Sequence, residues 1–105
     1  MSRPRLKPTP SVLKGLRIVE QAGDLGIRPR EFARAMWPDS PGWSRYVRSG
    51  PNGAHLGGGM YPAGGAFLGR LRNAGLARRT QNGRYDTAHA ITPAGREFLR
   101  AHADD

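Results

Sequence analysis

The sequence contains no cysteine, which excludes both a disulfide framework and a metal site built from thiolates. It also contains no apolar run long enough to span a bilayer, and its start, MSRPRLKPTP, lacks the apolar stretch of a secretory signal. These absences predict a soluble, cytoplasmic protein. Residues 1–10 are basic and rich in proline, and we interpret them as an extended arm, either solvated or lying along DNA, ahead of a domain at residues 11–105.

Acidic side chains are scarce as well, since 17 Lys and Arg stand against 8 Asp and Glu and give a formal net charge of +9. Such an excess attracts polyanions and speeds encounter with them, so nucleic acid is the first partner to consider. An acidic protein or a membrane surface would satisfy the same charge. With 105 residues, of which 37% are hydrophobic, the chain has material for one domain with a small core.

Candidate catalytic and metal-binding residues do not assemble into a site. His55, His89 and His102 are far apart, and none stands with a carboxylate or another histidine at the spacing of metal ligands. No serine has an evident base, and no paired carboxylates stand in an apolar setting. The glycines at 57–59 precede a predicted helix as in a phosphate-binding loop, but no lysine follows at the required spacing. We therefore expect no enzyme, no cofactor and no metal, and a structural role for His89.

Apolar residues at helical spacing, together with capping residues, predict four helices. The third has Phe67, Leu68 and Leu71 on its inner face and Gly75 at its C-terminal cap. The helices are expected from Thr9 or Ser11 to Gly23, from Pro29 to Pro38, from Pro62 to Gly75, and from Pro93 onward after a cap at Thr92.

Two further segments connect these helices. Strands at 76–81 and 85–91 flank Asn82-Gly83, a dipeptide typical of a tight hairpin turn, and Ile27 is a candidate for a brief strand that pairs with this hairpin. Residues 39–60 are rich in Gly, Pro, Ser and Asn and show almost no periodicity, which predicts a long inserted loop. We expect Trp37 and Trp43 to pack beneath this loop and pin it.

Three helices followed by a basic hairpin and a last helix form the layout of a winged helix-turn-helix. The segments FLGRLRNAGLARR and YDTAHAITPAGREFL carry this likeness, and through them the chain resembles MarR-type and related winged-helix DNA-binding regulators. The resemblance covers about residues 11–102 without the loop. It implies an α+β, mainly α, fold in which three helices, a β-hairpin wing and a C-terminal helix are joined, with a long loop inserted at 39–60 before the third helix.

The resemblance also implies that the third helix enters the major groove while the wing contacts phosphate or the minor groove beside it. The helix and the hairpin are then expected to form two prongs on one charged face. The first turns of the third helix carry only small side chains, so base reading would fall to the loop. The candidate DNA-binding residues are Arg45, Arg48, Asn52 and His55 in the loop, Ala63, Gly64, Gly65, Arg70 and Arg72 in the third helix, and Arg78, Arg79 and Arg84 in the wing.

The sequence thus favours a protein that binds double-stranded DNA, sequence-dependently or generally, and that acts as a small transcriptional regulator. The alternative is a winged-helix module that docks on a protein, for example a phage-encoded factor that binds a polymerase or another nucleic-acid enzyme. MarR-type proteins dimerise through long terminal helices, and this chain ends soon after Leu99, so a monomer and a homodimer both remain open. No membrane partner is expected.

Overall fold

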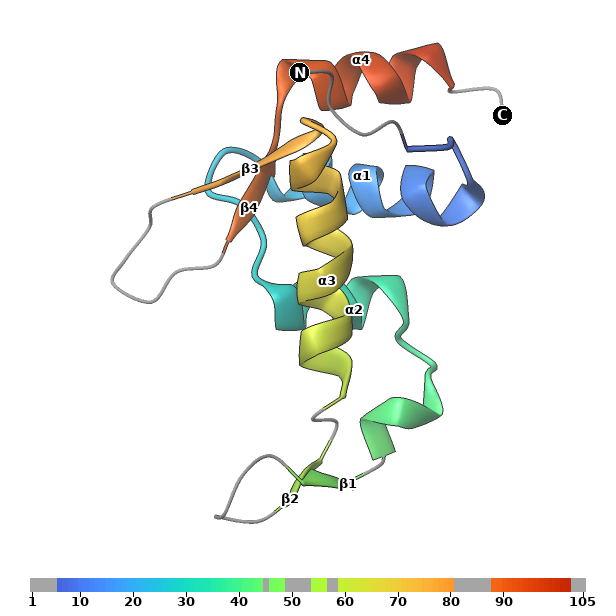
Figure 1. Ribbon diagram of the computed structural model, residues 1–105, viewed down its shortest axis with the longest axis vertical. Coiled ribbons are helices and arrows are strands. Elements are labelled where there is room, and N and C mark those ends of the chain that lie inside the picture. Colours follow the sequence, from blue (N-terminus) through green and yellow to red (C-terminus); the bar gives the residue numbers. More distant parts are fainter. Residues whose placement is uncertain (1–5, 45, 49–53, 57–58, 81–87, 103–105) are drawn as a thin grey trace.

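The computed structural model describes residues 6–44, 46–48, 54–56, 59–80 and 88–102, which form a mainly helical α+β fold (Figure 1). None of the helices in these residues combines the length and the apolar character needed to cross a membrane. In chain order the elements are α1 (Pro10–Ala22), α2 (Pro29–Met36), the 3-10 helix η1 (Pro41–Ser44), β1 (Tyr46–Arg48), β2 (Ala54–Leu56), α3 (Met60–Asn73), β3 (Ala77–Arg79), β4 (His89–Ile91) and α4 (Pro93–Ala101).

α1 begins and ends at residues that the sequence marks. The backbone N–H of Val12 donates to Thr9 Oγ1 at 3.2 Å, so Thr9 rather than Ser11 caps the helix. Gly23 follows the last turn with φ 73°, a left-handed value that favours glycine. Ahead of the helix, the half-buried Leu6 packs against the core, so the predicted arm is attached to the fold from this residue on.

α2 begins at Pro29, as predicted, because the first helical residue needs no N–H donor. At the other end of this helix, Lys14 Nζ of α1 donates to the carbonyl oxygen of Met36 at 2.8 Å. The last carbonyls of a helix have no partner within it, and a lysine satisfies one of them here. This bond ties the first two helices together.

α3 begins at Met60, two residues before the predicted start at Pro62, since a proline within the first turn breaks no helical hydrogen bond. Its C-terminal end matches the prediction. Gly75 has φ 79°, and the N–H of Leu76 donates to the carbonyl oxygen of Leu71 at 2.9 Å, the bond of a glycine-terminated helix that turns sharply into a strand.

The β3–β4 hairpin pairs antiparallel directly after this turn. Ile27 pairs with β4 of this hairpin, as predicted, because Ile27 N donates to His89 O at 2.8 Å and His89 N donates to Ile27 O at 2.9 Å. The ladder continues beyond β3, where Thr80 N donates to Ala88 O at 2.8 Å. β4 therefore lies between two strand partners. The predicted turn at 82–83 lies outside the described residues.

α4 is joined to the end of α3 by its cap. Thr92 Oγ1 accepts from Gly95 N at 3.0 Å and donates to Gly75 O at 2.7 Å, so one hydroxyl serves both helices. Gly95 allows the first turn to lie directly on the backbone of Leu76, where a Cβ atom would meet the carbonyl oxygen. Leu99, on the inner face, is buried as predicted.

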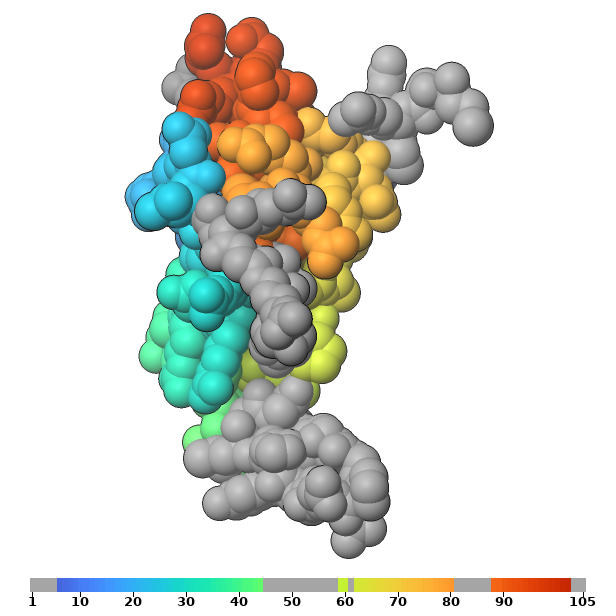
Figure 2. Space-filling model, turned by 90° about the vertical axis from the view of Figure 1, so that its left-hand side faces the viewer, coloured from blue at the N-terminus to red at the C-terminus, as the bar shows by residue number. Residues whose placement is uncertain are grey.

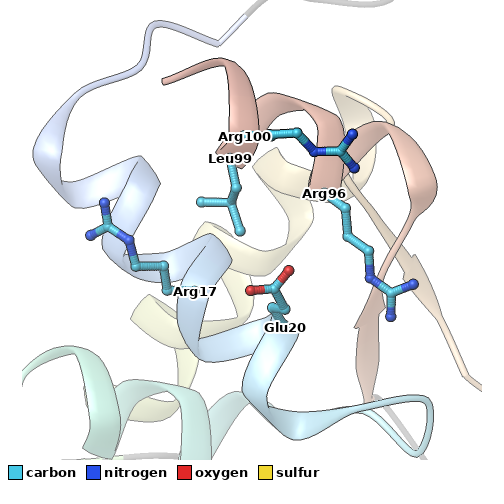
Figure 3. A pocket seen from close by; sticks show the side chains of 5 residues that line it. All are labelled: Arg17, Glu20, Arg96, Leu99 and Arg100. Carbon is cyan, nitrogen blue, oxygen red and sulfur yellow. The ribbon is translucent and has the colours of Figure 1, made fainter. Parts of the chain in front are cut away.

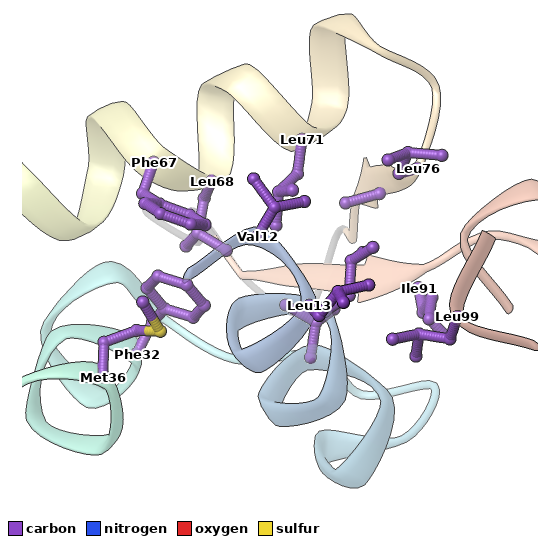
Figure 4. Packing of buried hydrophobic residues seen from close by; sticks show 13 residues of the cluster. Val12, Leu13, Phe32, Met36, Phe67, Leu68, Leu71, Leu76, Ile91 and Leu99 are labelled. Carbon is purple, nitrogen blue, oxygen red and sulfur yellow. The ribbon is translucent and has the colours of Figure 1, made fainter. Parts of the chain in front are cut away.

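The core fills the space between α1, α2, α3 and the β3–β4 hairpin (Figure 4). At its centre the ring of Phe67 lies 5.4 Å from the ring of Phe32 and 6.2 Å from that of Trp37, centroid to centroid. Aromatic pairs at such distances add to the free energy gained from burial alone. The buried members of the cluster are Val12, Leu13, Leu16, Val19, Phe32, Met36, Phe67, Leu68, Leu71, Leu76, Ala77, Ile91 and Leu99.

The segment 39–60 is not the irregular loop that its composition predicts. It contains η1 and the antiparallel β1–β2 hairpin, which lies beyond the N-terminal end of α3 (Figure 1). Strands of three residues are too short for alternation to stand out in sequence. The interpretation that the tryptophans pin this segment is confirmed for η1, since Trp43 Nε1 donates to Trp37 O at 2.6 Å and the Arg34 guanidinium lies 4.0 Å from the Trp43 ring centroid.

Candidate nucleic-acid interface

Two arginines of β3 lie at the surface in adjacent positions. Arg78 and Arg79 are both exposed, and Ala77 before them is buried. In the antiparallel register Arg79 stands opposite His89 and Arg78 stands opposite Ala90. Because residues directly opposite each other share one side of a ribbon and successive residues alternate, Arg79 lies on the side of His89, and Arg78 lies on the other side.

Arg72 of α3 reaches the same side of the hairpin. Its Nη1 atom lies 3.0 Å from Nε2 of His89, whose exposed fraction is 3%. A guanidinium only donates, so His89 Nε2 accepts this hydrogen bond. The structural role expected for His89 is therefore a link between α3 and β4. This link brings Arg72 and Arg79 to one side of the ribbon, around a single histidine.

Arg70 lies elsewhere on α3. Successive helical residues are rotated by about 100°, so Arg70 and Arg72 project about 160° apart around the helix axis. Arg70 is exposed, and its guanidinium lies 5.5 Å from the centroid of Phe67. The expectation that the helix arginines and the hairpin form one cluster therefore holds for Arg72 and not for Arg70.

Between these two flanks, the exposed surface of α3 is smooth except at Pro62 in its first turn and at Asn73, its last residue, which are also exposed. Ala63 and Ala66 are exposed, Gly65 and Gly69 are half-buried, and none carries more than a methyl group. α3 thus presents a strip of small residues bordered on one flank by Arg70 and on the other by Arg72.

Gly64 is not part of this strip, and its prediction as a DNA-binding residue is wrong. It is buried, and a Cβ atom there would meet the carbonyl oxygen of Pro29 and lie 3.1 Å from Cβ of Ala33. The glycine allows α3 to approach α2, not a nucleic acid. Gly65 also faces α2 in part, since its Cβ would lie 3.8 Å from Cβ of Pro29.

α2 adds basic residues that the sequence reasoning missed. Arg30 and Arg34 are exposed on the side of α2 opposite the buried Phe32, Ala33 and Met36. Their spacing of four residues places them on one helical face, and this spacing was the signal that could have identified them. α2, the β3–β4 hairpin and α3 all reach the surface on one side of the molecule (Figure 2).

The loop and wing candidates are placed only in part. Arg48 pairs with Ala54, and His55 pairs with Val47, in the β1–β2 hairpin that precedes α3. The remaining predicted residues, Arg45, Asn52 and Arg84, lie outside the described residues.

Charge on the described part of this surface is not neutralised internally. No carboxylate lies within salt-bridge distance of Arg30, Arg70, Arg78 or Arg79 among the described residues. At the start of α3, Gly59 provides no side-chain cap, and the first turn carries no acidic residue. Among the described residues, no side chain therefore neutralises the partial positive charge of that helix end.

The link between Arg72 and His89 predicts a difference between two neighbouring arginines. Arg72→Met removes the donor to His89 and is expected to lower the free energy of unfolding by about 1 kcal/mol. Arg70→Met is the matched control, with an expected change within about 0.5 kcal/mol, because an exposed cation over a ring contributes little. Urea denaturation followed by circular dichroism measures both. Equal losses of the free energy of unfolding in Arg72→Met and Arg70→Met would contradict a stabilising link between Arg72 and His89.

Comparison of the chain with protein-family models, with curated proteins and with solved structures found no match.

Proposed function

We propose that this protein is a winged-helix protein that binds double-stranded DNA through α3 and the β3–β4 hairpin. The observation that carries the proposal is the arrangement of exposed arginines without carboxylate partners, on α2, α3 and β3, around the smooth strip of α3. In this proposal α3 enters the major groove, β3 and β4 form the wing, and the protein acts as a small transcriptional regulator or DNA-binding accessory factor.

The small side chains of the α3 strip favour contact with the DNA backbone over hydrogen bonding to base edges. Alanine and glycine side chains at 63, 65, 66 and 69 offer no hydrogen-bonding groups to base edges. Arginines on both flanks of a helix that lies in a groove are placed to reach the phosphates on either side of it. We therefore infer general binding by α3 and the wing, with any sequence preference supplied by the β1–β2 hairpin.

A salt titration tests the proposal. Arg30, Arg70, Arg72 and Arg79 predict about four phosphate contacts, and hence a slope near −4 for the logarithm of the association constant against the logarithm of salt concentration. Fluorescence anisotropy of a labelled random duplex measures this slope, and a second duplex of different sequence measures the specificity ratio. Absence of duplex binding at about 50 mM salt would overturn the proposal.

A protein-docking module is the second candidate, and the same strip favours it. Small side chains allow close approach of another helix as readily as that of DNA. The titration separates the two, because a protein-docking module has no reason to give a steep salt dependence with duplex DNA. A pull-down that returns one protein after nuclease treatment, together with a shallow slope, would establish docking instead.

A further inference from the structure

A second basic surface lies away from α3. A hollow of about 380 Å³ between α1 and α4 is lined by Arg17, Glu20, Arg96, Leu99 and Arg100 (Figure 3). Leu99, which is 9% exposed, forms its apolar floor, and the four charged residues are exposed at its rim. Figure 3 shows the guanidinium of Arg17 on one side of Leu99 and those of Arg96 and Arg100 on the other.

The charges of this hollow are not balanced within the described residues. Among the described residues, no carboxylate lies within salt-bridge distance of Arg17 or Arg96, and Arg100 pairs with Glu97 at 3.5 Å, with both side chains at least 70% exposed. Such an exposed pair is screened by water and contributes little. Three guanidiniums, against the carboxylate of Glu20 in the lining and that of Glu97 beside Arg100, leave the described residues of the hollow with a net positive charge.

The hollow opens on the side of the molecule opposite α3. Leu16 and Val19 of α1 are fully buried in the core that this helix shares with α3, whereas Arg17 and Glu20 are exposed. α3 lies in front of α1 in Figure 1, whereas α1 and α4 lie in front of α3 in Figure 3. The core therefore separates the hollow from the strip of α3 and its flanking arginines.

The open shape of the hollow favours an extended ligand over a small enclosed one. A site that encloses a small ligand covers most of that ligand's surface, and this hollow is open with every charged group at its rim. Guanidinium groups match the geometry of phosphate oxygens, and arginines on both sides of the hollow can contact successive phosphates of one strand. An extended phosphodiester backbone fits this arrangement.

We propose that the α1–α4 hollow is a second nucleic-acid contact, so that one molecule bridges two duplex segments on opposite faces. The proposal rests on the proposed DNA binding by α3 and the wing. Glu20 has the wrong charge for a phosphate and weakens the contact. Substitutions at one hollow therefore have opposite effects: removal of the arginines reduces bridging, and removal of the Glu20 charge increases it.

A two-duplex capture assay tests the proposal with the full chain. One duplex is fixed to beads, and a labelled second duplex is retained only when the protein holds both. Arg17→Ala/Arg96→Ala is expected to reduce retention at least about tenfold while single-duplex affinity, measured by anisotropy, stays within about threefold. Glu20→Gln is expected to raise retention about threefold. Both arginines are exposed, and thermal melting checks that the double variant folds.

Several outcomes overturn bridging by the hollow. Unchanged retention of the second duplex by the double variant would contradict bridging by the hollow, and it is the result expected if protein dimers link the duplexes. Unchanged retention by Glu20→Gln would contradict it as well. If the protein binds polyglutamate more strongly than duplex DNA, and the double variant no longer binds polyglutamate, the hollow is a site for an acidic protein instead. If the double variant loses single-duplex binding and Arg79→Glu keeps it, the hollow is the DNA site and the proposed role of α3 and the wing fails.

Discussion

Reversing the charge of Arg79 should weaken duplex binding by roughly 30-fold, the loss of one charge-assisted hydrogen bond to phosphate together with the repulsion that follows. Arg79 stands opposite His89 in the hairpin ladder and therefore lies on the side where α3 contributes Arg72. The wing and α3 meet at this point. Arg79→Glu places a carboxylate next to the proposed path of the DNA backbone.

Arg78→Glu is the matched control for Arg79→Glu. The two residues are adjacent, both are exposed, and each substitution changes the net charge by the same amount. Arg78 lies on the other side of the ribbon, so only the general field changes, and an approximately threefold loss is expected. Anisotropy with a random duplex at fixed salt measures both variants. Equal losses would show that net charge alone controls binding, and a larger loss for Arg78→Glu would place the DNA on the other side of the wing.

Gly64→Ala should lower the free energy of unfolding by about 2 kcal/mol, although alanine is the better helix former. The added methyl group would meet the carbonyl oxygen of Pro29, and backbone atoms of two packed helices cannot move apart without opening the core. Because α2 and α3 separate in this variant, duplex affinity is also expected to fall. Urea denaturation measures the stability.

Gly69→Ala provides the control on the same helix. Apart from the helix's own backbone, the described residues place only Arg72 Nη2 within 4 Å of a Cβ atom at this position, at 3.9 Å, so the methyl group is accommodated. The helix then gains the propensity difference between alanine and glycine, which raises the free energy of unfolding by about 0.5 to 1 kcal/mol. If Gly69→Ala lowers the free energy of unfolding as much as Gly64→Ala does, the loss comes from adding a methyl group anywhere on α3 and not from the contact of Gly64 with α2.

Most ends of the helices were predictable because their chemistry is local. Thr9, Pro29, Gly75 and Thr92 each act on backbone groups within a few residues, and the structure places each where the sequence indicates. The pairing of Ile27 was predictable for a related reason, because a short strand beside a hairpin has few other partners. The winged-helix arrangement and its use in DNA binding remain predictions.

The candidate site was less predictable because it depends on which side each residue faces. Gly64 was assigned to the DNA surface from its place in the first turns of the third helix, yet its spacing to Phe67, Leu68 and Leu71 matches the buried side of the helix. Spacing would have given the right answer. The contact of Arg72 with His89 has no such signal, because it joins residues 17 positions apart through the angle between a helix and a hairpin.

The anchoring of η1 gives this protein an internal optical probe. The chain has two tryptophans, and both belong to the contact between α2, η1 and the base of α3. The indole of Trp43 donates a hydrogen bond and lies beneath a guanidinium, while Trp37 meets Phe67 edge-on with an angle of 76° between the rings. Tryptophan fluorescence, excited selectively over that of the three tyrosines, therefore reports on the packing of α2 and η1 against α3, and a ligand that engages only the α1–α4 hollow leaves this emission unchanged.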